Sequence, residues 1–314
     1  MSATPSGQLQ RGRPDHPHHG WSALPTRAAL RYPNGAAVAV CPVIAFETHE
    51  DALPEGWPQP NWLAGGVGRR PDPNIARIGQ REYGLRAGWP RLREAILGAG
   101  LRYAAAMDAM TAEEWPDLRE AVARDVAAGR AEWVAHGISV NRPLHDGMDE
   151  ATERAAIAEA RDRLAACGVR ARGWWGPEYG ESARTPAMLA REGYAFTLDW
   201  CNDEQPYPMT VPEGRLAALP PLADLDDAFS LSSPRGITPE SYGANLTAAA
   251  EGLARDGRRS ARCMVWAMRP FLVGQPFRIG PVESALRRIG ATEGVWAALP
   301  SQILAAAGLM EERA

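Results

Sequence analysis

The chain contains no lysine, because all 34 of its basic residues are arginine. This absence excludes a Schiff-base lysine, a pyridoxal phosphate anchor and the lysine of a phosphate-binding loop. Histidine is also scarce: three of the six histidines lie near the N-terminus, at His16, His18 and His19. Chemistry performed by this chain must therefore rely mainly on carboxylates, amides, arginines and a single well-placed imidazole.

The four cysteines, Cys41, Cys167, Cys201 and Cys263, are scattered and form no CxxC pair. We expect reduced thiols and a cytoplasmic protein. Residues 1–20 lack the apolar segment of a signal peptide, and no run approaches the roughly 18 apolar residues of a membrane span. With a net charge of −4 and no basic stripe, the chain is expected to bind a small-molecule substrate, and neither nucleic acid nor membrane.

The N-terminal part of the chain differs from the rest. Residues 1–34 are polar and proline-rich, which favours a solvated arm, with wrapping around a neighbouring subunit as the alternative. Residues 35–314 are expected to form a single domain, since 45% of the chain is apolar. A long segment rich in proline and glycine, residues 53–74, is typical of a functional loop or a subunit contact. Together with the arm, it predicts a homo-oligomer.

Strand and helix patterns alternate along the domain. Residues 36–46 form a continuous apolar run, as in a strand buried on both faces. Further strands are predicted at 101–107, 132–135, 172–175, 194–200, 216–219, 262–268 and 295–299. The helices between them are predicted at 85–99, 117–128, 150–167, 186–193, 239–256 and 282–289, with caps at Thr111, Asp149, Thr185 and Thr238. This alternation predicts an α/β fold with a parallel sheet, open or closed into a barrel.

Polar and aromatic side chains follow the ends of these strands. They are Glu47, His136, Asn141, Trp175, Glu181, Asp199, Trp200, Asp203 and Arg269. In parallel α/β folds the carboxyl ends of the strands meet on one rim, where the chemistry is performed. Acids, one imidazole, an amide and flat rings on one rim suit a hydrolytic site for a small polar ligand.

Five blocks in this order also carry a resemblance. They are His136-Gly137-Ile138-Ser139-Val140-Asn141, Asp149 to Arg154, Gly173 to Pro177, Leu198 to Pro206, and Arg269 to Phe277. The chain resembles the polysaccharide deacetylase (NodB-homology) superfamily over roughly residues 35–305, and most closely its metal-independent, allantoinase-like branch. The resemblance implies a distorted (β/α) barrel with fewer than eight strands, and hydrolysis of a C–N bond or an acetyl group in the rim pocket.

Three departures from the superfamily pattern affect its metal site. Glu47 stands where metal-dependent members have an Asp pair, Val140 replaces the second imidazole of a His-xxx-His pair, and Arg269 replaces the last histidine. Valine cannot ligate a metal, and the loss of ligands weakens a tetrahedral zinc site. The expectation is therefore a protein without a cofactor, with zinc as the alternative.

These considerations assign provisional roles. His136 or Glu47 takes a proton from water, Asp203 or Glu181 protonates the leaving nitrogen, and Arg269, Asn141 or a backbone N–H stabilises the oxyanion. Trp175, Asp199 and Trp200 are expected to bind the substrate.

Structural roles stand beside these catalytic ones. His136 could be a buried histidine bonded to backbone, Asp203 could cap a turn, and Arg269 could be an ion-pair partner. Arg81 could reach the pocket from the long loop or from a neighbouring subunit.

The function predicted is hydrolysis of a small cyclic amide, imide or ureide without a metal. One alternative is a metal-dependent deacetylase that uses Glu47 and His136 with another ligand. The other is a catalytically degenerate homologue that binds a ligand or a protein partner.

Overall fold

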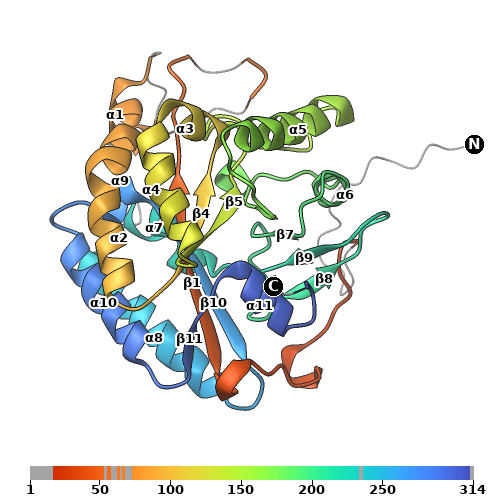
Figure 1. Ribbon diagram of the computed structural model, residues 1–314, viewed down its shortest axis with the longest axis vertical. Helices are drawn as coiled ribbons and strands as arrows, with labels where there is room; N and C mark the ends of the chain where they lie inside the picture. Colours follow the sequence, from red (N-terminus) through yellow and green to blue (C-terminus); the bar gives the residue numbers. More distant parts are fainter. Residues whose placement is uncertain are drawn as a thin grey trace, which may run out of the picture.

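The computed structural model describes residues 17–52, 55–57, 62–63, 66–67, 73–232 and 236–311. These residues form one large sheet with helices packed around it (Figure 1). The sheet order is β10-β1-β4-β5-β6-β7-β9-β8, and β11 adds to β1. The strands are β1 (Val38–Phe46), β4 (Tyr103–Met107), β5 (Ala131–Ala135), β6 (Gly173–Trp174), β7 (Phe196–Thr197), β8 (Tyr207–Met209), β9 (Leu216–Ala218), β10 (Arg262–Met268) and β11 (Val295–Ala297). The strand pairs of this sheet are parallel except for β8 with β9.

Side chains of β1 enter two different cores. Val38, Val40, Ile44 and Phe46 belong to the cluster that packs against the helices. The alternate residues, with Ala39, Cys41 and Ala45 among them, belong to a second cluster of mostly small side chains. Successive residues of a strand point to opposite faces, so this strand is buried on both. The continuous apolar run in the sequence has this cause, and the small residues line the inside of the curved sheet.

The sheet closes into a distorted barrel at a gap between its two ends. There Leu222 N donates to Val265 O at 2.7 Å, and Cys263 N donates to Glu204 O at 2.8 Å. These bonds join the segments around β8 and β9 to β10 without forming a ladder. The fold class expected from the sequence is confirmed. The sheet has nine strands, more than the number below eight that the resemblance implied.

Helices surround this wall. They are α1 (Ile75–Tyr83), α2 (Trp89–Gly98), α3 (Ala109–Glu114), α4 (Pro116–Ala127), α5 (Glu150–Ala166), α6 (Thr185–Arg191), α7 (Asp227–Leu231), α8 (Pro239–Gly257), α9 (Pro270–Val273), α10 (Ile279–Ala291) and α11 (Pro300–Ala306). Figure 1 shows α2, α8 and α10 along one flank, near β1 and β10. Elsewhere α3 packs against both α4 and α5. Within the described part of the chain, no helix combines the length and apolarity that a bilayer span requires.

Two predicted caps are correct and two are wrong. Asp149 accepts from Thr152 N, and Thr238 accepts from Ser241 N, as expected. Thr111 was predicted as a cap, but the N-cap of α3 is Asp108, whose carboxylate accepts from Thr111 N. Thr185 is the first residue of α6 rather than its cap, because its hydroxyl donates to the buried carboxylate of Glu153.

The helix predicted at 85–99 begins earlier, at Ile75. It runs through a π-helical turn, Gly84–Gly88, before α2 begins. Glycine and arginine residues in this stretch interrupt the apolar periodicity by which the helix was predicted. The π-helical turn also positions Arg81.

The described part of the N-terminal arm packs against its own chain. Thr210 N donates to His18 O at 2.7 Å, Ala261 N donates to Leu30 O at 3.0 Å, and Arg27 pairs with Asp203. Most residues of 17–34 are nevertheless exposed, and residues 1–16 lie outside the described part, so the solvated arm stays a prediction. Of the predicted loop 53–74, the described residues include a small hairpin, β2 (Trp62–Leu63) with β3 (Gly66–Val67).

Candidate active site

Glu47, the residue after β1, lies at the centre of a buried ionic cluster. Arg81 Nε is 2.9 Å from one carboxylate oxygen, while Arg269 Nε and His136 Nε2 are 3.3 and 3.4 Å from the other. Glu47, His136 and Arg269 are 3%, 0% and 4% exposed. Three separate strand ends, those of β1, β5 and β10, therefore bring predicted site residues together, and Arg81 joins them from α1.

The neighbours of Glu47 fix its charge. Burial alone would raise the pKa of this carboxyl, but Arg81, Arg269 and His136 outweigh burial and hold the pKa well below its ordinary value. Glu47 is therefore ionised at neutral pH and is a weak base. Of the two bases that the sequence offered, this favours His136.

The imidazole of His136 is held in one orientation. Its Nδ1 lies 2.7 Å from the carbonyl oxygen of Trp175, which can only accept, so Nδ1 carries a proton. The other nitrogen, Nε2, faces Glu47 Oε1. A neutral Nε2 and a carboxylate are both acceptors, so the pair needs either a proton on Nε2 or a third group that donates to both.

Arg269 is surrounded by acids beyond Glu47. Its Nη1 donates to Asp226 at 2.6 Å and to Asp227 at 3.1 Å, and its backbone N–H donates to Asp227 at 2.6 Å. Both aspartates are fully buried. Burial raises the pKa of Asp227 to about 7. Strand ends in the sequence did not reveal this pair, because Asp226 and Asp227 lie at the start of the short α7 and not directly after a predicted strand.

Two glycines let α1 and α2 approach the loop that carries Arg269. A Cβ on Gly84 would lie 2.7 Å from Phe271 N, and one on Gly88 would lie 2.1 Å from Pro270 O. Only glycine permits this contact between backbones. The guanidinium of Arg81 then lies 4.0 Å from the centre of the Phe271 ring. The π-helical turn thus places Arg81 beside Glu47, as the sequence had suggested was possible.

Asn141 fastens the loop after β1 to the loop after β5. Its Oδ1 accepts from Glu50 N at 2.8 Å, and its Nδ2 lies 3.3 Å from His49 Nε2. Burial lowers the pKa of His49, which agrees with a neutral ring that accepts from this amide. The side chain of Asn141 is therefore committed to positioning a loop.

Asp108 follows β4 and was also missed. One of its oxygens accepts from Thr48 N at 2.7 Å and the other from Thr111 N at 2.6 Å. Burial raises its pKa to about 7. The rule that found Glu47, a polar residue directly after a strand, applies equally to Asp108. Its observed role is to tie the loop after β1 to α3.

A second pair of acids lies beside Trp200. Thr197 Oγ1 is 3.2 Å from Glu181 and 3.0 Å from Asp199, and Trp200 Nε1 donates to Glu181 at 2.9 Å. A hydroxyl has one proton to donate, so one of these carboxyls must carry a proton of its own. Burial and then the neighbouring Asp199 raise the pKa of Glu181 well above its ordinary value, and burial raises that of Asp199 to about 6.

Trp175 connects the two groups of acids. Its ring stacks on His136 with centroids 4.4 Å apart and meets the edge of Tyr179 at 5.4 Å. The next residue, Gly176, donates its N–H to Asp199 at 2.8 Å. Trp174 packs among the helices against Tyr194 instead. The structure therefore places the second tryptophan, and not the first, beside the imidazole.

Tyr179 sits in a strained turn. Both Glu178 and Tyr179 have φ of 56°, which is unfavourable for residues with a side chain. The Tyr179 hydroxyl donates to Asp226 at 2.8 Å, and its ring lies 5.8 Å from that of Phe229, which is 51% exposed. The turn therefore carries an aromatic wall from the buried centre toward solvent.

Asp203 makes its hydrogen bonds away from both groups of acids. Its carboxylate pairs with Arg27 at 2.9 Å and accepts from the N–H groups of Glu204 and Gln205. This is the turn-capping role that the sequence left open, extended by an ion pair to the arm.

The donor set does not fit the zinc site that this fold implies. Within the described residues, no three His, Cys, Asp or Glu side chains are placed to hold a metal ion. Glu47 is instead met by the guanidinium groups of Arg81 and Arg269. A dication bound to this carboxylate would be repelled by both cations at short range.

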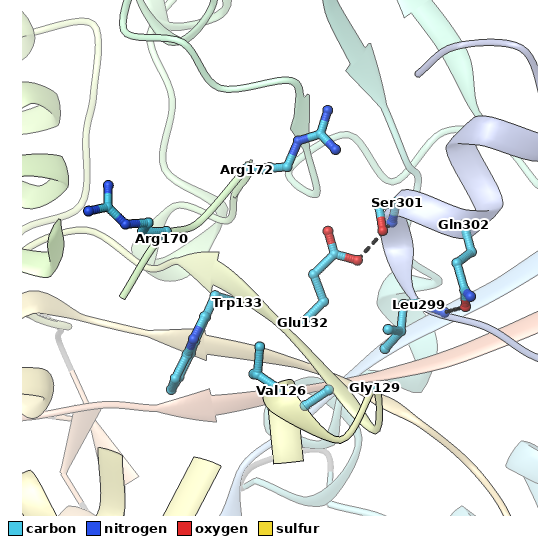
Figure 2. Close-up of a pocket in the computed structure, with 10 residues that line it drawn as sticks. Val126, Gly129, Glu132, Trp133, Arg170, Arg172, Leu299, Ser301 and Gln302 are labelled. Carbon is cyan, nitrogen blue, oxygen red and sulfur yellow. Dashed lines mark hydrogen bonds between the residues drawn. The ribbon is translucent and has the colours of Figure 1, made fainter. Parts of the chain in front are cut away.

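A cavity of about 250 Å³ lies at the other end of the strands, where β5 begins. Figure 2 shows Glu132, which accepts from Ser301 N, together with Arg170, Arg172 and Gln302. None of the predicted site residues lines this cavity.

Comparison with known proteins gives structural neighbours only. No family model matches the chain, and no curated protein matches its sequence. Puue allantoinase superposes with a TM-score of 0.78 and 21% identity over 91% of this chain and 95% of that one. A putative polysaccharide deacetylase from Mycobacterium smegmatis gives 0.73 and 24% over 90% and 93%. A probable polysaccharide deacetylase from Pseudomonas aeruginosa PAO1 gives 0.73 and 23% over 89% and 94%. The chain therefore has the fold of the polysaccharide deacetylase and allantoinase structures, as its motif blocks had indicated.

Proposed function

We propose that this protein is a hydrolase that opens a small cyclic amide, imide or ureide without a metal. One observation carries the proposal: His136 Nε2 and a carboxylate oxygen of Glu47 face each other at 3.4 Å, with Nδ1 already committed. A water molecule that donates to both acceptors would satisfy them and become oriented and activated for attack.

In the proposed reaction, His136 takes a proton from this water as its oxygen bonds to the ring carbonyl carbon. The carbonyl electron pair moves to oxygen. When the C–N bond breaks, Glu181 gives its proton to the nitrogen. The raised pKa of Glu181 keeps that proton available at neutral pH. Transfer of the proton from His136 to Glu181 through solvent restores both groups, so the net change is addition of one water.

Glu47 orients the water and stabilises the imidazolium that forms, while its two arginines keep it from competing for the proton. Trp175 and Tyr179 offer flat walls suited to a planar ring. His136 and Trp175 are closed to solvent in this conformation, so the reaction requires an opened form. The fold shared with an allantoinase supports a C–N hydrolase, and the two buried arginines support chemistry without a metal.

The test is a turnover assay on succinimide, hydantoin and dihydrouracil, with elemental analysis of protein purified without a histidine tag and assays before and after chelation. We expect activity without stoichiometric metal, lowered roughly 10²–10⁴-fold by His136→Gln and by Glu181→Gln. His145→Gln, which changes an imidazole outside the cluster, is the matched control and should leave kcat unchanged.

Tightly bound zinc, with activity lost on chelation, would replace this proposal with the deacetylase alternative. Binding without turnover, unaffected by the Glu181 change, would favour a degenerate homologue.

A further inference from the structure

The proposed hydrolysis needs a donor for the carbonyl oxygen as it becomes negative. We propose that this donor is the indole N–H of Trp175. The inference rests on the proposed function and deepens it by naming the oxyanion donor. It replaces the three candidates that the sequence offered, which are Arg269, Asn141 and a backbone N–H.

The side chains considered first are already occupied. Arg269 donates to Asp226 and Asp227, and its Nε faces Glu47. The amide of Asn141 is bound between His49 and the backbone of Glu50. Turning either group toward a substrate would leave buried acceptors without partners, which is destabilising.

The nearest backbone donors are also used. Trp175 N donates to Ala135 O at 2.9 Å, and Gly176 N donates to Asp199 at 2.8 Å. The first of these bonds continues the pairing of β5 with β6. Neither N–H can turn toward a ligand without breaking a contact that holds the site together.

The indole of Trp175 differs from all of these groups. Its ring is 1% exposed, and its Nε1 is buried without a hydrogen-bond partner, as are those of Trp174 and Trp266, but of these three only the Trp175 ring stacks on His136. Buried donors without an acceptor are rare in native proteins and call for an explanation, such as a ligand that completes them. His136 stacks on this ring, Tyr179 meets its edge, and Arg269 lies 5.4 Å from its centre. The unpaired N–H thus belongs to the ring that all three site residues contact.

Two further features suit an oxyanion donor. The ring is fixed on several sides, so it need not reorganise as charge develops. It also stacks on the imidazole that activates the water, so the donor and the base belong to neighbouring rings. The N–H donates a hydrogen bond without losing its proton, so the proton balance of the reaction is unchanged.

Trp174 offers a matched control. Its Nε1 is also buried without a partner, but its ring packs in the outer core against Tyr194. Trp174→Phe and Trp175→Phe therefore remove the same group from adjacent residues of equal burial, on opposite faces of the strand.

The experiment combines kinetics with indole ¹H–¹⁵N spectra of the wild-type protein titrated with hydantoin. We expect Trp175→Phe to lower kcat by roughly 10²–10³-fold with little change in KM. Trp174→Phe should stay within roughly three-fold of wild type, as for a core change away from the reacting atoms. The Trp175 indole proton, identified by its loss in Trp175→Phe, should move downfield on saturation.

Full kcat in Trp175→Phe would overturn the assignment in favour of a backbone donor, and so would an unmoved Trp175 signal while other signals shift. If Trp175→Phe does not fold, the wild-type signal is assigned from its proximity to His136 ring protons, and its shift decides. If wild type turns over no substrate, the proposed function fails, and a hydantoin-induced shift of the Trp175 proton would then establish a hydrogen bond to a bound ligand but not an oxyanion donor. No shift with any member of the substrate panel would overturn it.

Discussion

Glu47 and Glu181 belong to the same rim, yet their surroundings set them to opposite charge states. Glu47 is 3% exposed and meets two guanidinium groups, so its pKa is lowered despite its burial. Glu181 meets a hydroxyl, an indole N–H and a second carboxyl, so burial and Asp199 raise its pKa. A glutamate side chain is thus an anion at Glu47 and a proton donor at Glu181.

The contrast shows that burial alone does not decide the charge of an acid. What decides it is whether cations or acids share its surroundings. Acid–base chemistry without a metal requires two such settings close together, and the contacts of Trp175 and Gly176 join them here. The following predictions test the contrast in order of decreasing effect.

The largest expected effect comes from removing the cation that three acids share. Arg269→Met leaves Asp226 and Asp227 without the guanidinium that they share and leaves Glu47 with Arg81 as its remaining arginine, which should cost about 3–5 kcal/mol of unfolding free energy. Urea unfolding followed by circular dichroism measures it. Arg287→Met, which removes an exposed ion pair with Glu283, should cost no more than about 0.5 kcal/mol. A loss below about 1 kcal/mol for Arg269→Met would show that these acids are not charged as described.

A smaller effect is expected in the pH dependence of stability. The pKa of Asp199 is raised to about 6 in the folded state, so the folded state binds more protons than the unfolded state. Its contribution is present at low pH and is lost as pH rises through the window from about 4 to 6. Allowing for partial exposure, the change is on the order of 1–2 kcal/mol.

Glu47 contributes with the opposite sign. Its folded pKa is lowered, so its contribution is present above the ordinary value and is lost as pH falls below it. We measure the free energy of unfolding in urea between pH 3 and 7. In wild type it should decline as pH rises above 4, and this decline should be absent in Asp199→Asn. Its loss at the acid end of the range should be absent in Glu47→Gln. Parallel profiles for wild type and both variants would contradict the opposed settings.

The smallest effect is expected for Asp203, which the sequence offered as a leaving-group acid equivalent to Glu181. Since Asp203 is an ion-pair partner of Arg27 near the surface, Asp203→Asn should cost about 1 kcal/mol or less of stability. The kcat of Asp203→Asn should match that of wild type, in contrast to the kcat of Glu181→Gln. A large loss of kcat with unchanged stability would return Asp203 to the catalytic set.

Much of this fold follows from local patterns. The two-sided burial of β1 and the alternation with helices predicted the parallel sheet, and polar residues after strands identified Glu47, His136 and Arg269. Asp226 and Asp227 escaped this rule, because they reach the centre from the start of a short helix. Arg81 was only a possibility, since its position depends on glycine contacts with Pro270 and Phe271, far away in the sequence.

The protonation states of the acids could not be predicted from the sequence. Glu47 and Glu181 both come after strands, and nothing in their local sequence distinguishes an anion from an acid. Asp203 follows a strand too, but the arm residue Arg27 captures it. These outcomes depend on long-range partners whose distances only the folded structure fixes.

The position of β1 has a consequence for how the chain is made. β1 pairs with β4, which follows soon after it, and along its other edge with β10, where Val38 lies opposite Arg262. During synthesis from the N-terminus, that second edge must wait for nearly the whole domain to emerge. An unpaired apolar strand is a template for misassembly, and pairings so distant in sequence form slowly. Truncation before β10 should therefore yield an aggregating chain rather than a smaller working barrel.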